Sequence, residues 1–391
     1  MGIEMTDLED VKGIAGAAGK PQFNGEWVKL GLCFPYIKNG MNVKQQKGKS
    51  GIPITRIETL SGNRFNRDKV GYAGIISTEG IEDRILADGD ILMSHINSLP
   101  YLGRAVMYEK QDDEQMIHGM NLLRLKADRS TIRPDYAAAY FRSEHFRRQI
   151  IRIANKSVNQ ASFSVRNLKD LSFPLVTLDR QRDIVDRLNV VDNGINALQQ
   201  MLLRFDTLVK SRFIEMFGDM RANSKGLPIA VWRDVLVIKN GRNQKAVECS
   251  EGPYPICGSG GVMSRASSYI TSANSVIIGR KGNINTPILM REPFWNVDTA
   301  FGVEPNEAHL TVEYLYWFCQ WFDFNRLNKA VTIPSLTKTD LYSIQMPLPD
   351  ISSQKRFSAF VCQVDKLRFD VQQQIDKLEL LKSSLMQEYF G

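Results

Sequence analysis

The sequence predicts an α/β (α+β) protein in which two mixed α/β domains are joined by two long antiparallel coiled-coil helices, related by a pseudo-twofold internal repeat. Three observations predict this fold: a gapless internal repeat, a heptad pattern inside each copy, and a more variable block before each copy. The 391 residues suit two or three domains. We predict a first domain over 1–178, a central helix over 179–219, a second domain over 220–350 and a distal helix over 351–391.

The repeat is found by comparing the chain with itself. Residues 156–218 align without a gap onto residues 329–391, at a constant offset of 173. The identical pairs include Pro174 and Pro347, Gln181 and Gln354, Asp192 and Asp365, Gln199 and Gln372, Glu215 and Glu388, and Phe217 and Phe390. Chance does not hold one register over such a length, so the two segments are copies of one structure.

Each copy contains one long helix with a heptad pattern. Apolar residues recur at alternating steps of four and three, which is the seam of a coiled coil. In the first copy they are Ile184, Leu188, Val191, Ile195, Leu198, Leu202, Phe205 and Val209. In the second they are Phe357, Val361, Val364, Val371, Ile375 and Leu378, with Leu367, Leu381 and Leu385 beside the seam. We expect the two seams to bury each other.

The ends of these helices also have recognisable signals. Asp179 and Ser352 are acceptable N-caps, and a proline in each copy prevents a helix from running in from upstream. Gly218 and Gly391 stand where a left-handed residue would close each helix. A helix over 179–217 would be about 55 Å long, whereas the alternative is a pair of ordinary, much shorter core helices.

Weaker similarities connect the blocks upstream of the helices, 23–173 and 227–346. Trp27 followed by the run 37–40 resembles Trp232 followed by the run 238–241, and the strand-like run 89–93 resembles 274–278. Asp135-Tyr136 resembles Glu313-Tyr314 at the start of an aromatic helix. The predicted order is therefore domain, helix, domain, helix.

The composition is typical of a globular protein that binds a polyanion. The net charge is +7, and no apolar run is long enough to cross a membrane. Residues 1–20 lack the apolar segment of a secretory signal, so we expect a cytoplasmic protein. The five cysteines and four histidines show neither a C-x-x-C pair nor zinc-site spacing, which favours reduced, mostly buried thiols and no metal.

The layout of domains and helices resembles the specificity subunits of type I restriction-modification systems over nearly the whole chain. The run 208–219, Leu-Val-Lys-Ser-Arg-Phe-Ile-Glu-Met-Phe-Gly-Asp, resembles the end of the central helix in many such subunits. The segment 232–241 is also similar to the start of their second domain. Met220 departs from the pattern, because proline would be expected there.

The resemblance implies a non-catalytic subunit that recognises double-stranded DNA. It implies a bipartite site, with one half bound by each domain and the gap set by the coiled coil. It also implies two methyltransferase (modification) subunits and restriction or motor subunits as partners. No cofactor is expected in this chain, since S-adenosylmethionine, ATP and Mg²⁺ would bind the partner subunits.

Near-matches to catalytic motifs fail on inspection. Val43 stands where a P-loop ending in Lys47-Gly48-Lys49-Ser50 would need its first glycine. The run 258–261 lacks the last glycine of a dinucleotide-binding turn and is not followed by a helical pattern. No Asn-Pro-Pro-Tyr motif and no nuclease or nucleophile pattern is present. We therefore predict no active site.

Loops that combine Lys or Arg, Asn and Gly are the predicted DNA contacts, because they suit phosphates and base edges. In the first domain they are Lys38, Asn39, Lys44, Lys47, Lys49, Arg64, Arg67, His95, Asn97 and Arg104. In the second they are Lys239, Asn240, Arg242, Asn243, Lys245, Ser259, Arg280, Lys281 and Asn283. For any single one of these residues, the alternative is a solvated surface side chain.

The loop before each long helix is a further candidate because it recurs in both copies. Its residues are Lys156, Asn159, Gln160 and Ser162 in the first copy, and Lys329, Thr332 and Ser335 in the second. We expect these to contact the sugar-phosphate backbone. The alternative is a loop that only closes the domain onto its helix.

Two further points stay open at this level. The aromatic run Tyr314, Tyr316, Trp317, Phe318, Trp321, Phe322 and Phe324 favours core or a protein interface over base stacking. The alternative function is an adaptor whose tandem domains bind protein, and a third is an enzyme with an unrecognised site. Duplex binding that falls steeply with salt would distinguish DNA recognition from the adaptor.

Overall fold

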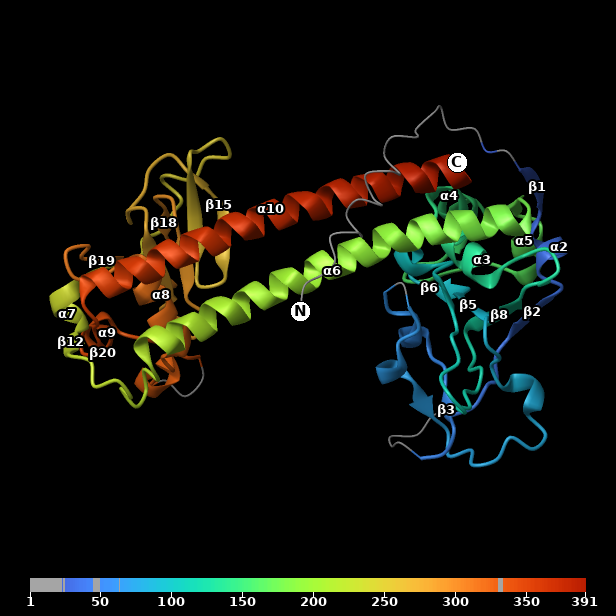
Figure 1. The fold of residues 1–391 in the computed structure, drawn as a ribbon, viewed down its shortest axis with the longest axis horizontal. Coiled ribbons are helices and arrows are strands. Elements are labelled where there is room, and N and C mark those ends of the chain that lie inside the picture. The colour runs from blue at the N-terminus through green and yellow to red at the C-terminus, as the bar shows by residue number, and fades with distance from the viewer. Residues whose placement is uncertain (1–22, 24, 45–49, 63, 330–332) are drawn as a thin grey trace. The chain divides into compact units, whose positions relative to one another are not determined.

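The structure is a computed structural model, and the residues it describes are 23, 25–44, 50–62, 64–329 and 333–391. The chain divides into two compact units. Unit 1 comprises residues 1–197 and 375–391, and unit 2 comprises residues 198–374. Each unit thus contains one mixed α/β domain together with one half of each long helix (Figure 1).

Unit 1 is built around a four-stranded antiparallel sheet. The strands lie in the order β2 (Tyr36–Asn39), β8 (Leu122–Lys126), β5 (Ile91–Ser94) and β7 (Ala105–Met107). Smaller pairings join β1 (Glu26–Lys29) to β11 (Ser172–Leu175) and β3 (Pro53–Ile54) to β4 (Gly71–Tyr72). In a three-stranded sheet, β10 (Ala161–Ser162) lies between β6 (Ile96–Asn97) and β9 (Asn155–Lys156). The short helices are α2 (Leu30–Cys33), α3 (Pro134–Tyr140), α4 (Glu144–Ile153) and α5 (Val165–Lys169), with 3-10 turns at Ile57–Leu60, Arg67–Lys69, Glu82–Arg84 and Leu99–Tyr101.

Unit 2 repeats this plan with the same order of strands in its main sheet. That sheet contains β13 (Leu236–Asn240), β19 (Ala300–Pro305), β16 (Ser275–Gly279) and β17 (Ile288–Met290). A second sheet contains β15 (Gly261–Ala266), β14 (Tyr254–Gly258) and β18 (Trp295–Asn296), while β12 (Ile229–Val231) pairs with β20 (Gln345–Pro347). The helices are α7 (Trp232–Val235), α8 (Val312–Trp321) and α9 (Lys338–Tyr342), with a 3-10 turn at Phe324–Leu327.

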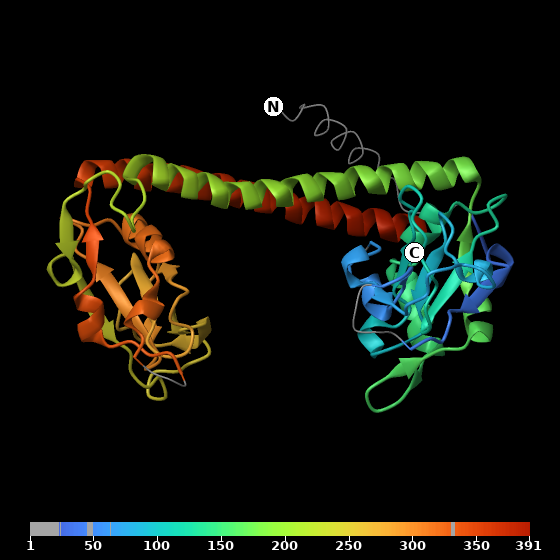
Figure 2. The same ribbon diagram turned by 90° about the horizontal axis from the view of Figure 1, so that it is seen from below.

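The two long helices, α6 (Leu178–Phe217) and α10 (Ile351–Phe390), each contain 40 residues. Within unit 1 their halves run antiparallel, because Asp192 pairs with Lys382 at 2.5 Å while Arg180, further back on α6, lies over the ring of Tyr389 (Figures 1 and 2). Within unit 2, Arg368 pairs with Asp206 at 2.6 Å. The predicted fold class, with two mixed domains and a long helix after each, is confirmed.

The apolar seams of both helices are mostly buried. On α6, Val191 is fully buried, and on α10 Phe357 is fully buried. Leu202 and Phe205 are only half-buried, and Leu367, predicted to lie beside the seam, is 50% exposed. The seam residues are therefore buried most completely near the domains, where residues of the domain core also pack against them.

Both helices begin slightly earlier than the sequence predicted. The capping side chains are Thr177, whose hydroxyl accepts the Arg180 N–H at 3.3 Å, and Asp350, whose carboxylate accepts the Ser353 N–H at 2.9 Å. These residues occupy the same position in the two copies, and they replace the predicted caps Asp179 and Ser352. A cap must accept an amide two or three positions ahead, and the sequence alone offered several suitable side chains.

The predicted helix ends are confirmed. Gly218 and Gly391 have positive φ angles of 79° and 84°. Their amides donate to Ile214 O at 2.7 Å and to Gln387 O at 2.9 Å. The left-handed conformation closes each helix and favours glycine, which has no Cβ to clash with the backbone.

The structural repeat covers the domains as well as the helices. The Tyr136 hydroxyl donates to Pro174 O at 3.0 Å, and the Tyr314 hydroxyl donates to Pro347 O in the same way. This confirms that α3 and α8 are equivalent. Trp232, however, corresponds to Leu30 rather than to Trp27, because the Trp232 and Leu30 amides donate to Ile344 O and Leu171 O.

The Trp27 similarity was therefore wrong, and burial gives the reason. Trp27 lies on β1 with 40% of its surface exposed, whereas Leu30 and Trp232 are both fully buried at the start of a short helix. The comparison was suggested by the tryptophan that both segments contain. The shared position is instead filled by two different large apolar side chains.

Candidate nucleic-acid interface

The first predicted contact loop leaves the main sheet of unit 1 at the end of β2. Lys38 is exposed and its Nζ lies 5.1 Å from the ring centroid of Tyr36. The side chain of Asn39 accepts the Gly40 N–H at 2.9 Å, and Lys44 is exposed. Three predicted contacts, Lys47, Lys49 and Thr332, lie outside the described residues. Lys38 and Lys44 thus present free charge on one stretch of chain.

The corresponding loop of unit 2 follows β13. Asn240, Arg242, Asn243 and Lys245 are exposed, and the Asn243 carboxamide oxygen accepts the Lys245 N–H at 2.9 Å. Lys239 is held by Glu304 at 3.6 Å and is only half-exposed. The loop therefore offers polar and cationic side chains on a short, internally hydrogen-bonded turn.

A glycine in the same place starts both loops. A Cβ on Gly40 would lie 1.9 Å from Gly119 O, and a Cβ on Gly241 would lie 1.8 Å from Val297 O. No other residue fits such a close approach of two backbones. The two loops therefore leave their sheets at equivalent points, which makes Lys38 and Lys239, and Asn39 and Asn240, equivalent candidates.

A second pair of equivalent segments follows the central strands β5 and β16. The Phe163 amide donates to His95 O at 3.2 Å, and the Leu336 amide donates to Arg280 O at 2.9 Å. Since Phe163 and Leu336 are matched residues of the repeat, His95 and Arg280 occupy one position. In each unit a backbone hydrogen bond thus connects the segment after the central strand to the loop before the long helix.

The side chains at this position differ in environment. Burial lowers the pKa of His95, although a hydrogen bond with the Asn121 backbone opposes that shift. Its Nδ1 is buried without a hydrogen-bond partner among the described residues. Arg280 is half-buried over the ring of Phe301, at 5.9 Å. Burial therefore favours the neutral form of His95.

In unit 1 the loop before α6 is a projecting hairpin formed by β9 and β10. Lys156, Asn159 and Gln160 are exposed, and Val158 at the tip is 98% exposed. Ser162 is half-buried, since it pairs with β6 at its base. In Figure 2 the hairpin extends from the side of unit 1 opposite α6. Its tip is thus free to enter a groove.

The equivalent loop of unit 2 is tied more closely to its own domain. Lys329 forms an ion pair with Asp340 at 2.8 Å, and the Ser335 amide donates to Asn328 at 3.0 Å. Ser335 also forms a β-bridge with Lys281, as Ser162 pairs with Ile96 in unit 1. Lys329 must therefore give up an internal partner before it can contact a phosphate.

The remaining predicted contacts are spread over several places. Asn97 donates from its amide to Ser94 at 3.2 Å, and Asn283 accepts from Thr286 at 2.9 Å. Ser259 is half-buried in the turn between β14 and β15. The oxygen of Asn97 also accepts the Ser98 N–H at 2.8 Å, so both polar groups of Asn97 are engaged locally, as is the oxygen of Asn283.

Two of the predicted arginines are committed to internal partners. Arg67 forms two hydrogen bonds with Glu114 and donates to Glu109 O at 2.6 Å. Arg104 donates to Leu60 O at 3.3 Å and stacks over Tyr101. We therefore remove Arg67 and Arg104 from the contact set. The sequence alone could not show their carboxylate, carbonyl and aromatic partners.

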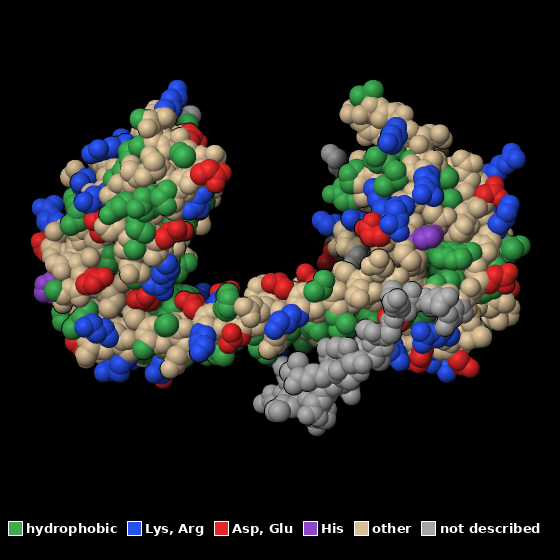
Figure 3. All heavy atoms as spheres, turned by 90° about the horizontal axis from the view of Figure 1, so that it is seen from above, with side chains coloured by type: hydrophobic (Ala, Val, Ile, Leu, Met, Phe, Trp, Pro, Cys, Tyr) green, Lys and Arg blue, Asp and Glu red, His purple; other side chains and the backbone are tan. Residues whose placement is uncertain are grey.

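Charge is distributed in groups on both units. Figure 3 shows Lys and Arg side chains of each unit in separate clusters among neutral and acidic ones, without one continuous basic stripe on the face drawn. Such a surface suits loops that contact phosphates at several points. It does not resemble a uniform electrostatic track.

The aromatic helix α8 is mainly core. Tyr314 is fully buried and Phe318 is 3% exposed, and both contribute to the core of unit 2. Trp321 is half-buried, with Lys210 Nζ at 4.9 Å from its ring. The structure thus agrees with the preferred interpretation of this run and leaves no row of exposed rings for base stacking.

The described residues contain no group of three or more His, Cys, Asp or Glu placed to hold a metal. Burial raises the pKa of Cys33 and of Cys257 to about 11, so both thiols stay protonated near neutral pH. No described helix combines the length and hydropathy needed to cross a bilayer.

Sequence reasoning missed two kinds of residue. Gln181 and Gln354 stood out as repeat identities, but their structural role needed the fold. Arg142 had no sequence signal, yet it lies beside Arg64 in a hollow between α6 and the first domain. An isolated arginine between two helices looks like any surface charge until its neighbours are known.

A family model described as Type I restriction modification DNA specificity domain matches residues 24–203 and 232–380. The chain belongs to this family. Each match begins near the first strand of a domain and extends into the long helix that follows it. The chain therefore contains two DNA specificity domain matches, and each copy of the repeat overlaps the last part of one match.

Relatives agree with this assignment. The chain is 29% identical to a Methanocaldococcus jannaschii protein with the provisional name type I restriction enzyme MjaX specificity subunit, over 90% of this chain and 89% of that one. The fold of this chain is similar to that of the type I restriction-modification S subunit from M. genitalium, with a TM-score of 0.57 at 15% identity, covering 95% and 98% of the chains. A chain from a study of assembly and conformational transition of the type I R-M system gives 0.57 at 16%, covering 95% and 99%.

Proposed function

We propose that this specificity-family protein recognises a bipartite site in double-stranded DNA, with one half-site bound by each domain and the gap set by the paired long helices. The observation that carries this proposal is the presence of two DNA specificity domains in one chain. Each is followed by a 40-residue helix. The chain acts in the cytoplasm and carries no catalytic step of its own.

The equivalent loops support an arrangement with two half-sites. In both domains a glycine-led loop, a segment after the central strand and the loop before the long helix come from matched positions. The side chains on these segments differ between domains, for example His95 and Arg280. Equivalent backbones with different side chains are what two half-sites of different sequence require.

Catalysis in this proposal belongs to partner subunits. Two methyltransferase subunits would dock on the chain, and restriction or motor subunits would join them for cleavage. These partners would bind S-adenosylmethionine, ATP and Mg²⁺. The repeat supports a pair of identical partners, because it presents matched surfaces on the two copies.

The decisive test is to co-express the chain with its neighbouring methyltransferase and to map methylated bases across the host genome. We expect a split motif whose two halves are separated by a fixed, unspecified gap. Methylation at one continuous motif, or none at all, would count against the proposal. Salt-insensitive binding to a protein instead of to a duplex would support the adaptor.

The hairpin of unit 1 provides a residue-level test. Lys156→Ala should weaken binding to specific and non-specific duplexes to a similar extent and lower the slope of log K against log salt by about one. Lys329→Ala should have a smaller effect, because Asp340 already partners that ammonium in the free chain. The measurement is fluorescence anisotropy at several salt concentrations. An unchanged slope in the Lys156 variant would remove this hairpin from the interface.

A further inference from the structure

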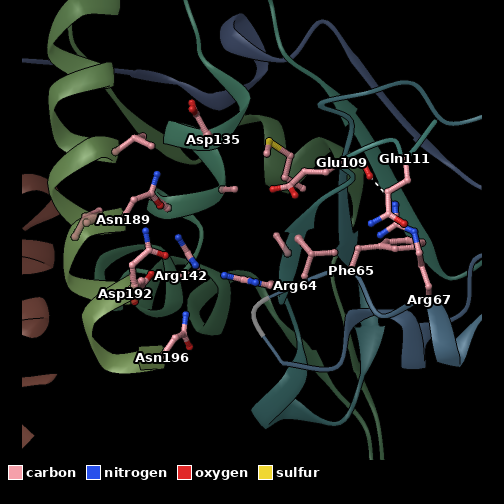
Figure 4. A pocket seen from close by; sticks show the side chains of 18 residues that line it. Arg64, Phe65, Arg67, Glu109, Gln111, Asp135, Arg142, Asn189, Asp192 and Asn196 are labelled. Atoms are coloured by element: carbon pink, nitrogen blue, oxygen red, sulfur yellow. Dashed lines mark hydrogen bonds between the residues drawn. The ribbon is translucent and has the colours of Figure 1, made fainter. Parts of the chain in front are cut away.

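A hollow with a volume of about 570 Å³ lies in unit 1 between α6 and the first domain. Arg64 comes from the loop before the Arg67–Lys69 turn, and Arg142 from the junction between α3 and α4. Figure 4 shows the guanidinium ends of Arg64 and Arg142 directed toward one another, with Asn189 and Asn196 of α6 beside them. The hollow is thus cationic on one side and rich in amides on the other.

Neither arginine has a counter-ion among the described residues. Asp192, which also lines the hollow, is paired with Lys382 at 2.5 Å, and Asp135 is paired with Arg133 at 2.6 Å. Arg64 and Arg142 are both exposed. Partial desolvation lowers the pKa of Arg142, Asp192 opposes this shift, and Arg64 adds to it. Two like charges that face each other raise the free energy of the unoccupied hollow.

Unit 2 contains the repeat-related hollow and serves as an internal comparison. It is lined by Glu313, Gln320 and Asp365, at the positions of Asp135, Arg142 and Asp192. Its carboxylates pair with arginines of the chain, and Lys210, which also lines it, lies over the ring of Trp321.

In that second hollow, Arg291 pairs with Glu313 at 2.5 Å and lies 3.9 Å from Asp365. Arg368 pairs with Asp206 at 2.6 Å. Gln320, in place of Arg142, brings no charge. The unmatched arginines are therefore particular to unit 1 and are not required by the shared fold.

We propose that the hollow of unit 1 binds a phosphate group, held between Arg64 and Arg142 with the amides of Asn189, Asn193 and Asn196 as further hydrogen-bond donors. A guanidinium fork matches phosphate oxygens in a bidentate manner. A tetrahedral phosphate offers enough acceptors for two forks and the amides, and its charge offsets both cations. A single carboxylate offers two oxygens and one charge.

The volume of the hollow exceeds what one phosphate needs, so the group belongs to a larger molecule or is bound with water. The source is either the backbone of duplex DNA or a free phosphate compound. The DNA source rests on the proposed function, whereas the free source does not. Both require the same two arginines.

The test uses the full chain with Arg64→Gln, Arg142→Gln and the double variant. Arg166→Gln, which removes an exposed charge on α5 outside the hollow, is the matched control. Thermal unfolding is followed with inorganic phosphate, pyrophosphate and ATP at constant ionic strength, with chloride as reference. If the phosphate is free, we expect a saturable rise in Tm for wild type and the control, and at least a tenfold loss of apparent affinity in the double variant.

The DNA arm measures duplex binding against salt. If the phosphate belongs to the backbone, loss of this one phosphate contact in the double variant should lower the slope of log K against log salt by about one, and the control should leave the slope unchanged. Arg142→Lys keeps the charge without the fork and should recover part of the effect. Arg142→Lys also provides the test of the proposal if Arg142→Gln does not fold.

The proposal is overturned if neither arm responds to the arginines, or if polyglutamate stabilises the wild type where phosphate compounds do not. If duplex binding has the same salt slope in all variants and phosphate compounds do not raise Tm, the phosphate site is rejected while DNA recognition is supported. If neither the wild type nor any variant binds duplex, while the rise in Tm with phosphate compounds depends on both arginines, the proposed function is rejected and the phosphate site is supported.

Discussion

His118 and Asn296 show how one buried position is filled differently in the two domains. Both side chains are almost fully buried. Nε2 of His118 donates to Leu122 O at 2.8 Å, and the amide of Asn296 donates to Ala300 O at 3.2 Å, four residues ahead in each case. The position requires a polar donor that braces the loop after the strand, and either side chain supplies it. Only the histidine adds a titratable group.

This difference predicts a pH dependence that one substitution removes. Burial lowers the pKa of His118 to about 4, against about 6.5 in an unfolded chain. Below pH 6.5 the unfolded chain binds the proton more readily, so stability falls as the pH drops from 6.5 toward 4 and is unaffected above that range. The expected loss across this range is roughly 3 kcal/mol.

His118→Asn, which copies the second domain, should flatten that part of the profile. The measurement is the free energy of urea unfolding between pH 7 and pH 5. The exposed His309→Asn substitution is the control and should retain the wild-type slope. Equal slopes in wild type and His118→Asn would show that this histidine is not the titrating group.

At the scale of elements, a buried glutamine attaches each long helix to its domain. The Gln181 amide donates to Thr131 O at 2.7 Å and to Val176 O at 2.9 Å, and its oxygen accepts the Arg133 N–H at 2.8 Å. Gln354 makes the same three hydrogen bonds in unit 2, with His309 O, Pro349 O and the Thr311 N–H. Both glutamines are fully buried.

Replacing either glutamine should loosen the helix from its domain. Gln181→Leu or Gln354→Leu leaves three buried backbone groups without partners, so we expect each to lower the free energy of unfolding by roughly 2–4 kcal/mol. Urea denaturation followed by circular dichroism measures this loss. Gln200→Leu, at an exposed position of α6 that is also identical in both copies, should change stability by less than about 0.5 kcal/mol. Similar losses in the buried and exposed variants would contradict this role.

At the scale of the whole molecule, the proposed function makes the helices a spacer. Inserting one heptad at matching places in α6 and α10 preserves both seams and adds about 10 Å of helix. The gap in the methylated motif should then lengthen by about three base pairs, at about 3.4 Å each, while both half-sites stay the same. Genome-wide methylation mapping reads both quantities.

An insertion in α6 alone puts the two seams out of register and should abolish methylation. The double insertion restores the register, so it separates a spacing effect from a folding defect. If the double insertion methylates the original motif with its original gap, the helices do not set the spacing.

The amino-acid sequence by itself determined the duplicated plan, the two long helices and their terminal glycines. These features depend on local rules, namely heptad periodicity and the preference of glycine for the left-handed backbone conformation. The repeat contains each of these signals twice. Identity between the copies also marked Gln181 and Gln354, without showing what they bind.

Only the tertiary structure decided which polar side chains are free. Arg67 and Arg104 met the same criteria as Arg64, but their partners Glu114 and Leu60 lie over 40 residues away in the chain. Arg142 and Arg64, far apart in the sequence, line one hollow only because the first domain folds and α6 covers them on one side. Whether a charge is already neutralised depends on contacts distant in sequence, and those contacts form only when the chain folds.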